Sequence, residues 1–198
     1  ALKVGAKSDA IFKDTSFTTT GAAVSMTAED GKIDLSTTDN SKVMNASSLT
    51  VTAGTDIDLG SRQVVATTDA TVTAGGSVNA TKTDLKALNA LSLKAGNDVL
   101  VTNAKFNGRS VAVTATTGSV TANGISLTST EATAVNAGKD IALNSAQIKG
   151  ADVSLASTAG QVSASNAELA VTEALKVGAK SDAIFKDTSF TTTGAAVS

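Results

Sequence analysis

Aspartate recurs at a regular spacing that could support chemistry. Five acids stand just before short apolar stretches at near-even intervals along the chain: Asp9, Asp56, Asp98, Asp140 and Asp182. A row of carboxylates could bind Ca²⁺, which takes six or more oxygen ligands in one place. Asp also accepts hydrogen bonds within its own turn. Each position has a single Asp, which supplies too few oxygens for Ca²⁺. We therefore expect each Asp carboxylate to accept a hydrogen bond within its own turn.

Catalytic groups are scarce. The chain has no His and no Cys, so it has no imidazole base, thiol nucleophile or ordinary zinc site. Paired carboxylates can hydrolyse glycosidic bonds, but Asp56 and Asp58 alternate with Ile57 and Leu59 and should be two solvated surface charges. The only arginines, Arg62 and Arg109, are not equivalent in the repeat described below. We therefore predict no catalytic, cofactor-binding or metal-binding residue, and no enzyme activity.

The sequence also gives no sign that the chain binds sugars, ice or nucleic acid or enters a membrane. Sugar binding normally uses exposed aromatic platforms, yet all five phenylalanines fall at positions predicted to face inward, namely Phe12, Phe17, Phe106, Phe185 and Phe190. A threonine ladder that could bind ice begins at Thr50/Thr52 and Thr71/Thr73 but fails at Ala112/Thr114. The net charge is −2, which gives no basic footprint for nucleic acid. No apolar run is long enough for a membrane span.

A short repeat organises these residues. LTVTAGTDIDL, LSLKAGNDVLV and TAVNAGKDIAL begin at Leu49, Leu91 and Thr133, and weaker copies lie between them. Repeats start at positions 2, 24, 49, 70, 91, 111, 133, 153, 175 and 197, so the steps are short and nearly even. Apolar residues alternate with period two, and β-branched residues are abundant, which predicts strands rather than helices.

Each repeat contains three alternating pieces. In the fifth repeat they include Leu91 and Leu93, then Val99 and Val101, then Ala104 and Phe106, and Gly108 marks the following turn. Three short strands in about 21 residues predict one coil of a parallel β-helix, in which equivalent positions stack about 4.8 Å apart. The fold expected is therefore all-β: a single-stranded parallel β-helix of about nine coils, each with three short strands, spanning residues 1–198 as one domain.

The predicted interior follows from this alignment. Val101, Leu143 and Phe185 should line one sheet, and a second sheet should be lined by Leu85, Phe106, Leu127, Ile148, Leu169 and Phe190. The longest step, from position 24 to position 49, has extra residues within TTDNSKVMNA (37–46), which we expect to form a bulging surface loop. The five acids fall in every other coil, and the coils between them carry Lys32, Ser77, Ser119 and Gln161 there. Skipping a coil keeps like charges about a Debye length apart.

A longer repeat is superimposed on the short one. The opening block at positions 1–25, ALKVGAKSDAIFKDTSFTTTGAAVS, recurs without one substitution at positions 174–198. Eight short repeats make up one unit of this longer repeat. The pattern is that of a window from a longer tandem array, in which a copied block lengthens a rod without disturbing its interfaces.

The motif AGxD[IV]xL, seen as AGTDIDL, AGNDVLV and AGKDIAL, resembles the haemagglutinin repeats of filamentous haemagglutinin-like exoproteins. These are the secreted partners of two-partner secretion systems and include adhesins. The resemblance covers the whole chain and implies a right-handed β-helix, secretion across the outer membrane and a role as an extended fibre. The near-verbatim 173-residue unit departs from the family, whose members usually vary along the stalk.

The function expected is a non-catalytic shaft segment of a secreted or cell-surface fibrous adhesin or filament. The alternative is a glycan-binding or polysaccharide-degrading module on the same fold. The partners expected are adjacent repeats of the same chain and other copies joined end to end, because both ends are ordinary coils with unpaired strand edges. Contacts with a host or neighbouring-cell receptor or glycan are expected from other parts of the parent protein. We expect no cofactor, nucleic acid or membrane insertion.

Overall fold

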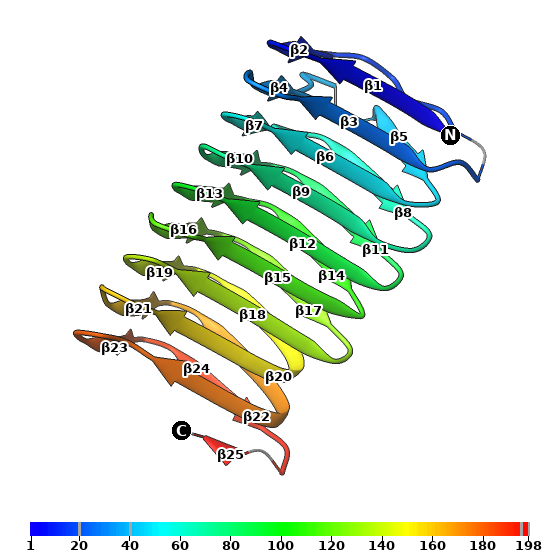
Figure 1. The fold of residues 1–198 in the computed structure, drawn as a ribbon. Helices are drawn as coiled ribbons and strands as arrows, with labels where there is room; N and C mark the ends of the chain where they lie inside the picture. Colours follow the sequence, from blue (N-terminus) through cyan, green and yellow to red (C-terminus); the bar gives the residue numbers. More distant parts are fainter. Residues whose placement is uncertain (20, 40, 195, 198) are drawn as a thin grey trace.

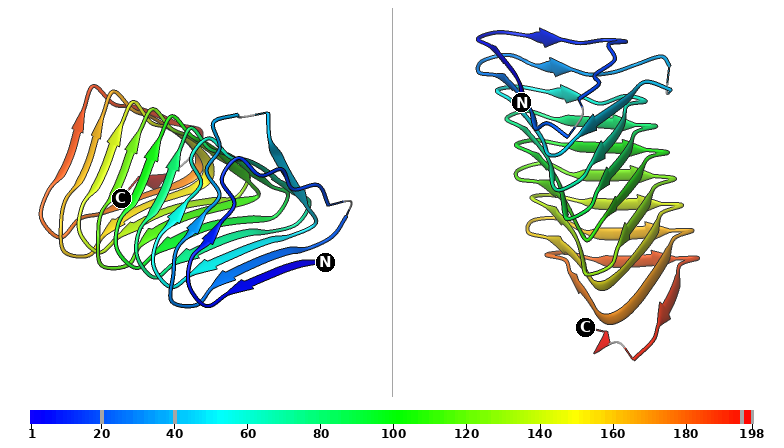
Figure 2. Two further views of the ribbon diagram at one scale, coloured as in Figure 1. Left: turned by 90° about the horizontal axis from the view of Figure 1, so that it is seen from above. Right: turned by 90° about the vertical axis from the view of Figure 1, so that its right-hand side faces the viewer.

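The chain folds as an all-β solenoid (Figures 1 and 2). A computed structural model describes residues 1–19, 21–39 and 41–194, together with the backbone of 196–197. These residues contain 25 strands and no helix. One hydrogen-bonded sheet has nine strands, one per coil, which confirms the predicted coil number. All recorded strand pairings between coils are parallel, as a single-stranded β-helix requires.

The first side of the rod carries the long strands that begin each coil. They run parallel down the molecule in Figure 1: β1 (Leu2–Ala6), β3 (Val24–Ala28), β6 (Leu49–Ala53), β9 (Ala70–Ala74), β12 (Ala90–Ala95), β15 (Ser110–Ala115), β18 (Ala132–Ala137), the second halves of β20 (Gln147–Ser157) and β22 (Glu168–Gly178), and β25 (Ala196–Val197).

The second side is the nine-stranded sheet, and the third side closes each coil. The second side contains β2 (Ala10–Ile11), β4 (Ile33–Asp34), β7 (Ile57–Asp58), β10 (Val78–Thr81), β13 (Val99–Thr102), β16 (Val120–Asn123), β19 (Ile141–Asn144), β21 (Val162–Ser165) and β23 (Ala183–Lys186). The third side contains β5 (Val43–Ala46), β8 (Gln63–Ala66), β11 (Asp84–Ala87), β14 (Lys105–Gly108), β17 (Ser126–Ser129), the first halves of β20 and β22, and β24 (Ser189–Thr192). Because β20 and β22 turn the corner without a break, the third and first sides join into one 16-stranded sheet.

The repeat boundaries are confirmed by the strand register. Every residue predicted to start a repeat pairs with the start of the next coil, from Leu2 with Val24 to Leu175 with Val197. The extra residues of the second coil lie between Leu35 and β5, where the described residues 36–39 and 41–42 form no strand, as expected of a loop; residue 40, within the expected loop, lies outside the described residues.

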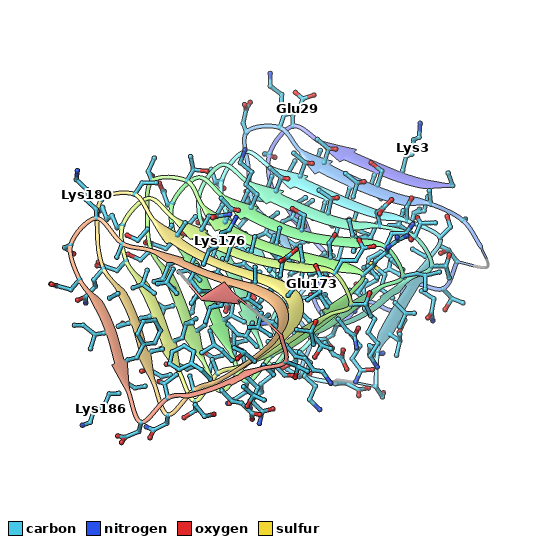
Figure 3. All side chains as sticks on the ribbon, turned by 90° about the horizontal axis from the view of Figure 1, so that it is seen from below. Lys3, Glu29, Glu173, Lys176, Lys180 and Lys186 are labelled. Carbon is cyan, nitrogen blue, oxygen red and sulfur yellow. The ribbon has the colours of Figure 1, made fainter. Side chains whose placement is uncertain are left out.

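The core occupies the bore of the solenoid, as the alternation predicted. Val101 and Leu143 are buried on the second side, and the third-side column of Leu85, Phe106, Leu127, Ile148 and Leu169 is buried in register. Charged side chains such as Lys3, Glu29 and Lys180 project outward from the coils (Figure 3). The prediction fails at the last coil, where Phe185 is only partly buried and Phe190 is 44% exposed.

The duplicated block shows what a neighbouring coil contributes. Phe17, with coils stacked on its C-terminal side, is 7% exposed, whereas the identical Phe190 is 44% exposed. Conversely, residues 189–192 form β24 on the template of β22, while residues 16–19 make only the isolated bridge from Thr18 to Asn45. Since the sequences are identical, these differences come from stacking alone.

A left-handed residue turns the chain from the second side to the third in the first coil and in the third to ninth coils. Positive φ values recur at an even spacing in the third to ninth coils, at Ser61, Lys82, Asn103, Gly124, Ser145, Asn166 and Asp187, and Asp14 takes the same conformation in the first coil. Asn, Asp and Gly tolerate this region, and the others are held there by the stack. This column positions the residue that follows it, which points into the bore.

Candidate functional site

The row of alternating acids was the first candidate, and its geometry differs from the prediction. Four of the five carboxylates, those of Asp9, Asp56, Asp98 and Asp140, accept a hydrogen bond from the next coil and not from their own turn. Oδ1 of Asp56 accepts the backbone N–H of Ser77 (2.7 Å), and Oδ1 of Asp98 accepts that of Ser119 (2.7 Å). Asp9 and Asp140 bind the N–H groups of Lys32 and Gln161 in the same way (3.0 and 2.9 Å). The expected bond within the turn is therefore wrong for these four acids, because the stacked coil supplies the N–H that the carboxylate accepts.

Glycine completes this contact in the coil that receives it. The residue before each receiving N–H is Gly31, Gly76, Gly118 or Gly160, and a Cβ atom there would overlap with Oδ1 of the acid in the preceding coil. None of these glycines has a positive φ, so space and not backbone conformation requires them. Sequence reasoning missed this partnership, although Gly-Lys, Gly-Ser and Gly-Gln occur at the coil positions that alternate with the acids.

The opposite junctions use the serines. The N–H of Asp98 donates to Oγ of Ser77 (3.4 Å), and that of Asp140 donates to Oγ of Ser119 (3.3 Å). The described residues contain no group of three or more acidic, His or Cys side chains arranged to hold a metal ion. The carboxylates of Asp9, Asp56, Asp98 and Asp140 thus hold neighbouring coils together.

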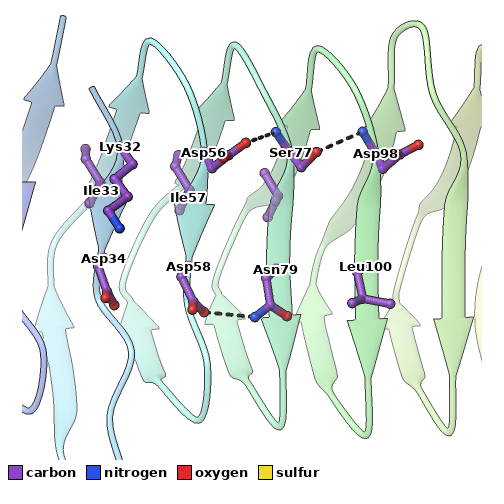
Figure 4. Close-up of a pocket in the computed structure, with 11 residues that line it drawn as sticks. Lys32, Ile33, Asp34, Asp56, Ile57, Asp58, Ser77, Asn79, Asp98 and Leu100 are labelled. Atoms are coloured by element: carbon purple, nitrogen blue, oxygen red, sulfur yellow. Dashed lines mark hydrogen bonds between the residues drawn. The ribbon is translucent and has the colours of Figure 1, made fainter. Parts of the chain in front are cut away.

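A shallow depression of about 460 Å³ lies beside this row, on the outer face of β4, β7, β10 and β13 (Figure 4). Asp34 and Asp58 are partners in the strand register. Oδ1 of Asp58 accepts hydrogen bonds from the Gly60 N–H (2.8 Å) and from Nδ2 of Asn79 (3.0 Å), and Oδ1 of Asp34 accepts the Ser36 N–H (2.9 Å).

Asp56 and Asp58, the two carboxylates predicted to be surface charges and not a glycosidase pair, border the same depression. Both side chains lie on the outer face, as predicted, because Ile57 and Leu59 between and after them are buried. Asp56 is exposed, whereas Asp58 is half-buried. Their carboxylates turn to different partners, Ser77 and Asn79. The pair therefore does not converge on a common point where a sugar ring could react (Figure 4).

Arg62 occupies an unexpected position in the bore. Its exposed fraction is 0%, and its guanidinium donates to the carbonyl oxygens of Leu35 (2.6 Å) and Thr15 (2.7 Å). The ring of Phe17 lies 5.9 Å from the guanidinium carbon. Burial lowers the pKa of Arg62, and the nearby Asp14 and Asp34 oppose that effect. The residue follows the left-handed Ser61, which directs its side chain inward; this turn is the signal that sequence reasoning lacked.

Arg109, the other arginine, and Asp14, next to the second-coil loop, do not line the depression. Arg109 forms an exposed ion pair with Glu131 (2.7 Å) on the outside of the rod. Asp14 accepts the backbone N–H of Thr38 (2.7 Å) and its hydroxyl (2.8 Å), and these bonds hold the pKa of Asp14 below its ordinary value. Asp14 thus holds Thr38, at the start of the second-coil loop, through Oδ1 of its carboxylate.

Comparisons with known proteins leave the chain unassigned. No protein-family model, no curated protein and no solved structure matches it. Within the described residues, no helix has the length and apolar character needed to cross a membrane.

Proposed function

We propose that this chain is a non-catalytic structural segment of the shaft of a long, secreted or cell-surface fibrous protein. The observation that carries the proposal is the unbroken register of the coils. Each repeat start pairs with the next from Leu2 to Val197, including the junction where the duplicated block begins at Ala174. A copied block continues the stack with no special connection, which is what extension of a rod requires.

The outer side chains support the same role. The acids, glycines and serines of the alternating row join neighbouring coils and do not converge on a ligand. The interior is a continuous and mainly apolar cluster that runs from one coil to the next, so stability comes mostly from nearest-neighbour stacking. A stack of this kind gives length and resistance to proteases without a separate scaffold.

Secretion is proposed from the sequence. The AGxD[IV]xL motif resembles the repeats of filamentous haemagglutinin-like exoproteins, and a chain with no Cys suits passage across a membrane in an unfolded state. In this proposal the shaft separates functional modules, and contacts with a receptor or glycan belong to other parts of the parent protein.

The competing function is glycan binding in the depression on the second side. Its polar lining, with Asp58 and Asn79, favours this alternative. The depression contains no aromatic ring, however, and the one Phe among the large exposed apolar side chains of the described residues is Phe190, at the end of the rod. A sugar would therefore lack a stacking platform there.

Two measurements on the full chain test the shaft function. Trypsin should leave the central coils intact, although Lys86, Lys94 and Lys105 lie there, and should cut first near Lys180 and Lys186 in the last coil. A glycan array probed with the labelled chain should give no signal. Binding that Asn79→Ala abolishes and Asn107→Ala, on the third side, leaves unchanged would establish the competing function. Rapid cleavage throughout the central coils would also overturn the proposal.

A further inference from the structure

The alternating row creates two kinds of junction between neighbouring coils. In the first kind, an Asp carboxylate meets a Gly and the N–H that follows it, as Asp56 meets Gly76 and Ser77. In the second kind, a serine hydroxyl accepts the N–H of an Asp, as Ser77 accepts that of Asp98. Figure 4 shows the two junctions in succession, with Ser77 between the two acids. Ser77 therefore contacts an acid on each side, in two different ways.

The chain thus contains two types of coil, which alternate. We call the coils that carry Asp in this row acid coils, and the coils between them glycine coils. In the glycine coils the residue before the row position is Gly31, Gly76, Gly118 or Gly160. In the acid coils the equivalent residue has a side chain, as Ser8, Thr55, Asn97, Lys139 or Ser181. No acid coil follows another in the sequence.

The geometry of the first junction explains why acid coils are kept apart. A Cβ atom on Gly118 would overlap with Oδ1 of Asp98, and one on Gly160 would overlap with Oδ1 of Asp140. A second acid coil stacked on the first would bring such a Cβ atom to this place. It would also put two carboxylates about 4.8 Å apart, the spacing of adjacent coils, where like charges repel. Adjacent acid coils are therefore destabilised twice, by overlap and by charge.

The apolar core alone does not distinguish one neighbour from another. Val99, Val120 and Ile141 occupy equivalent buried positions in three successive coils. A coil that stacked on its second neighbour would therefore keep most of its core packing. Some other contact must specify which coils can be adjacent, because register errors are expected wherever stacked strands are alike.

We propose that the alternation of acid and glycine coils specifies this register, so that a stable rod gains or loses coils in pairs. The longer repeat obeys this rule. Asp9 and Asp182 are equivalent residues of its two copies and lie eight coils apart, an even number. A unit with an odd number of coils would begin and end with an acid coil, and its copy would set two acid coils in contact. The inference is independent of the proposed shaft function.

Two deletions in the full chain test the inference. Removing residues 111–132, the sixth coil, brings Asp98 against Lys139 and Asp140, which are two residues of an acid coil. Removing residues 111–152, the sixth and seventh coils, brings Asp98 against Gly160 and Gln161, which form the first kind of junction with Asp140 in the unmodified chain. The two-coil deletion should melt at the higher temperature by circular dichroism. Nearest-neighbour stacking alone predicts the reverse order, because the two-coil deletion buries less surface.

Two substitutions separate the effect of the junction from the loss of a coil. Lys139→Gly/Asp140→Ser converts the seventh coil into a glycine coil. In the one-coil deletion this change should raise the melting temperature by roughly 5 °C, because the overlap and the like charge at Asp98 are both removed. In the unmodified chain the same change should lower the melting temperature, since Asp140 no longer accepts the Gln161 N–H. Opposite signs in the two backgrounds would identify the junction as the cause.

Lys149→Gly/Asp152→Ser is the matched control. It makes the same exchanges of residue type in the same coil, at two exposed residues of β20 that lie away from the row, and it should not raise the melting temperature of the one-coil deletion. The proposal is wrong if the control raises that temperature as much as the row substitutions do, or if the row substitutions fail to raise it. It is also wrong if the two-coil deletion does not fold, or if it melts no higher than the one-coil deletion.

Discussion

At the scale of single residues, the contact between an Asp and a Gly in the next coil leaves no room for a Cβ atom at the glycine. Gly76 tests it most directly, because Oδ1 of Asp56 is the only atom that an added Cβ would meet at less than 3.0 Å. Gly76→Ala should lower the free energy of unfolding by about 1–3 kcal/mol, since the carboxylate must move away from the Ser77 N–H. Denaturant titration followed by circular dichroism measures this loss.

The chain supplies a control and a rescue. A Cβ at Gly178 would meet nothing within 4 Å, so Gly178→Ala should change the free energy of unfolding by less than about 0.5 kcal/mol. Asp56→Ala removes the obstructing oxygen, and the double variant should lose less stability than the two single variants together. Additive losses would mean that Gly76 is required for some reason other than the carboxylate.

The acids were predictable at this scale, but their partners were not. The position of Asp56 in every second repeat is visible in the sequence, while its bond to Ser77 appears only once the coil register is known. Arg62 is the clearest miss, because an arginine placed at random faces water. Its burial depends on Ser61 adopting a left-handed conformation and on the carbonyl groups of Leu35 and Thr15, which accept hydrogen bonds from the guanidinium.

At the scale of strands, alternation alone specified which side chains enter the bore. In β19, Leu143 is 1% exposed, and the neighbouring Ala142 faces outward and is half-buried. Leu143→Asp should unfold the chain, because a charge cannot remain in the apolar bore without a partner. Thermal melting by circular dichroism measures the effect, and Ala142→Asp, with the same new charge on the outer face, should melt within a few degrees of the unmodified chain. A cooperative melt of Leu143→Asp at an unchanged temperature would refute the assigned orientation of β19.

Strand existence was more predictable than strand extent. The first and second pieces of each repeat became β12 and β13 in the fifth coil, as the alternation predicted. The fusion of the third and first sides in β20 and β22 was not predicted; in β20 the strand continues through Gly150, although Gly inside a strand often marks a bulge or a bend. Residues 16–19 and 189–192 have the same sequence, yet only residues 189–192 form a strand, because β22 of the preceding coil serves as their template. The extent of a strand therefore depends on its neighbours as well as on its own sequence.

At the scale of the whole molecule, the repeat period determines the geometry. Lys7 and Lys180 are equivalent residues of the first and last coils, eight coil steps apart, and both are exposed. Eight steps of about 4.8 Å give a separation of about 38 Å along the axis, and the five steps from Lys7 to Thr116 give about 24 Å.

The lack of native Cys makes this separation measurable, because spin labels can be attached at introduced cysteines without side reactions. Pulsed electron–electron double resonance measures the distance between two spin labels. The double variants Lys7→Cys/Lys180→Cys and Lys7→Cys/Thr116→Cys should give distances in the ratio of eight to five, after allowance for the label linkers. The reason is that the rise per coil is set by backbone hydrogen bonds and is the same for every coil. Gly76→Ala should leave this ratio nearly unchanged while lowering stability, since one strained junction shifts a single step. A ratio well below eight to five would mean that the axis bends, and a rod that bends within nine coils would not serve as a stiff shaft.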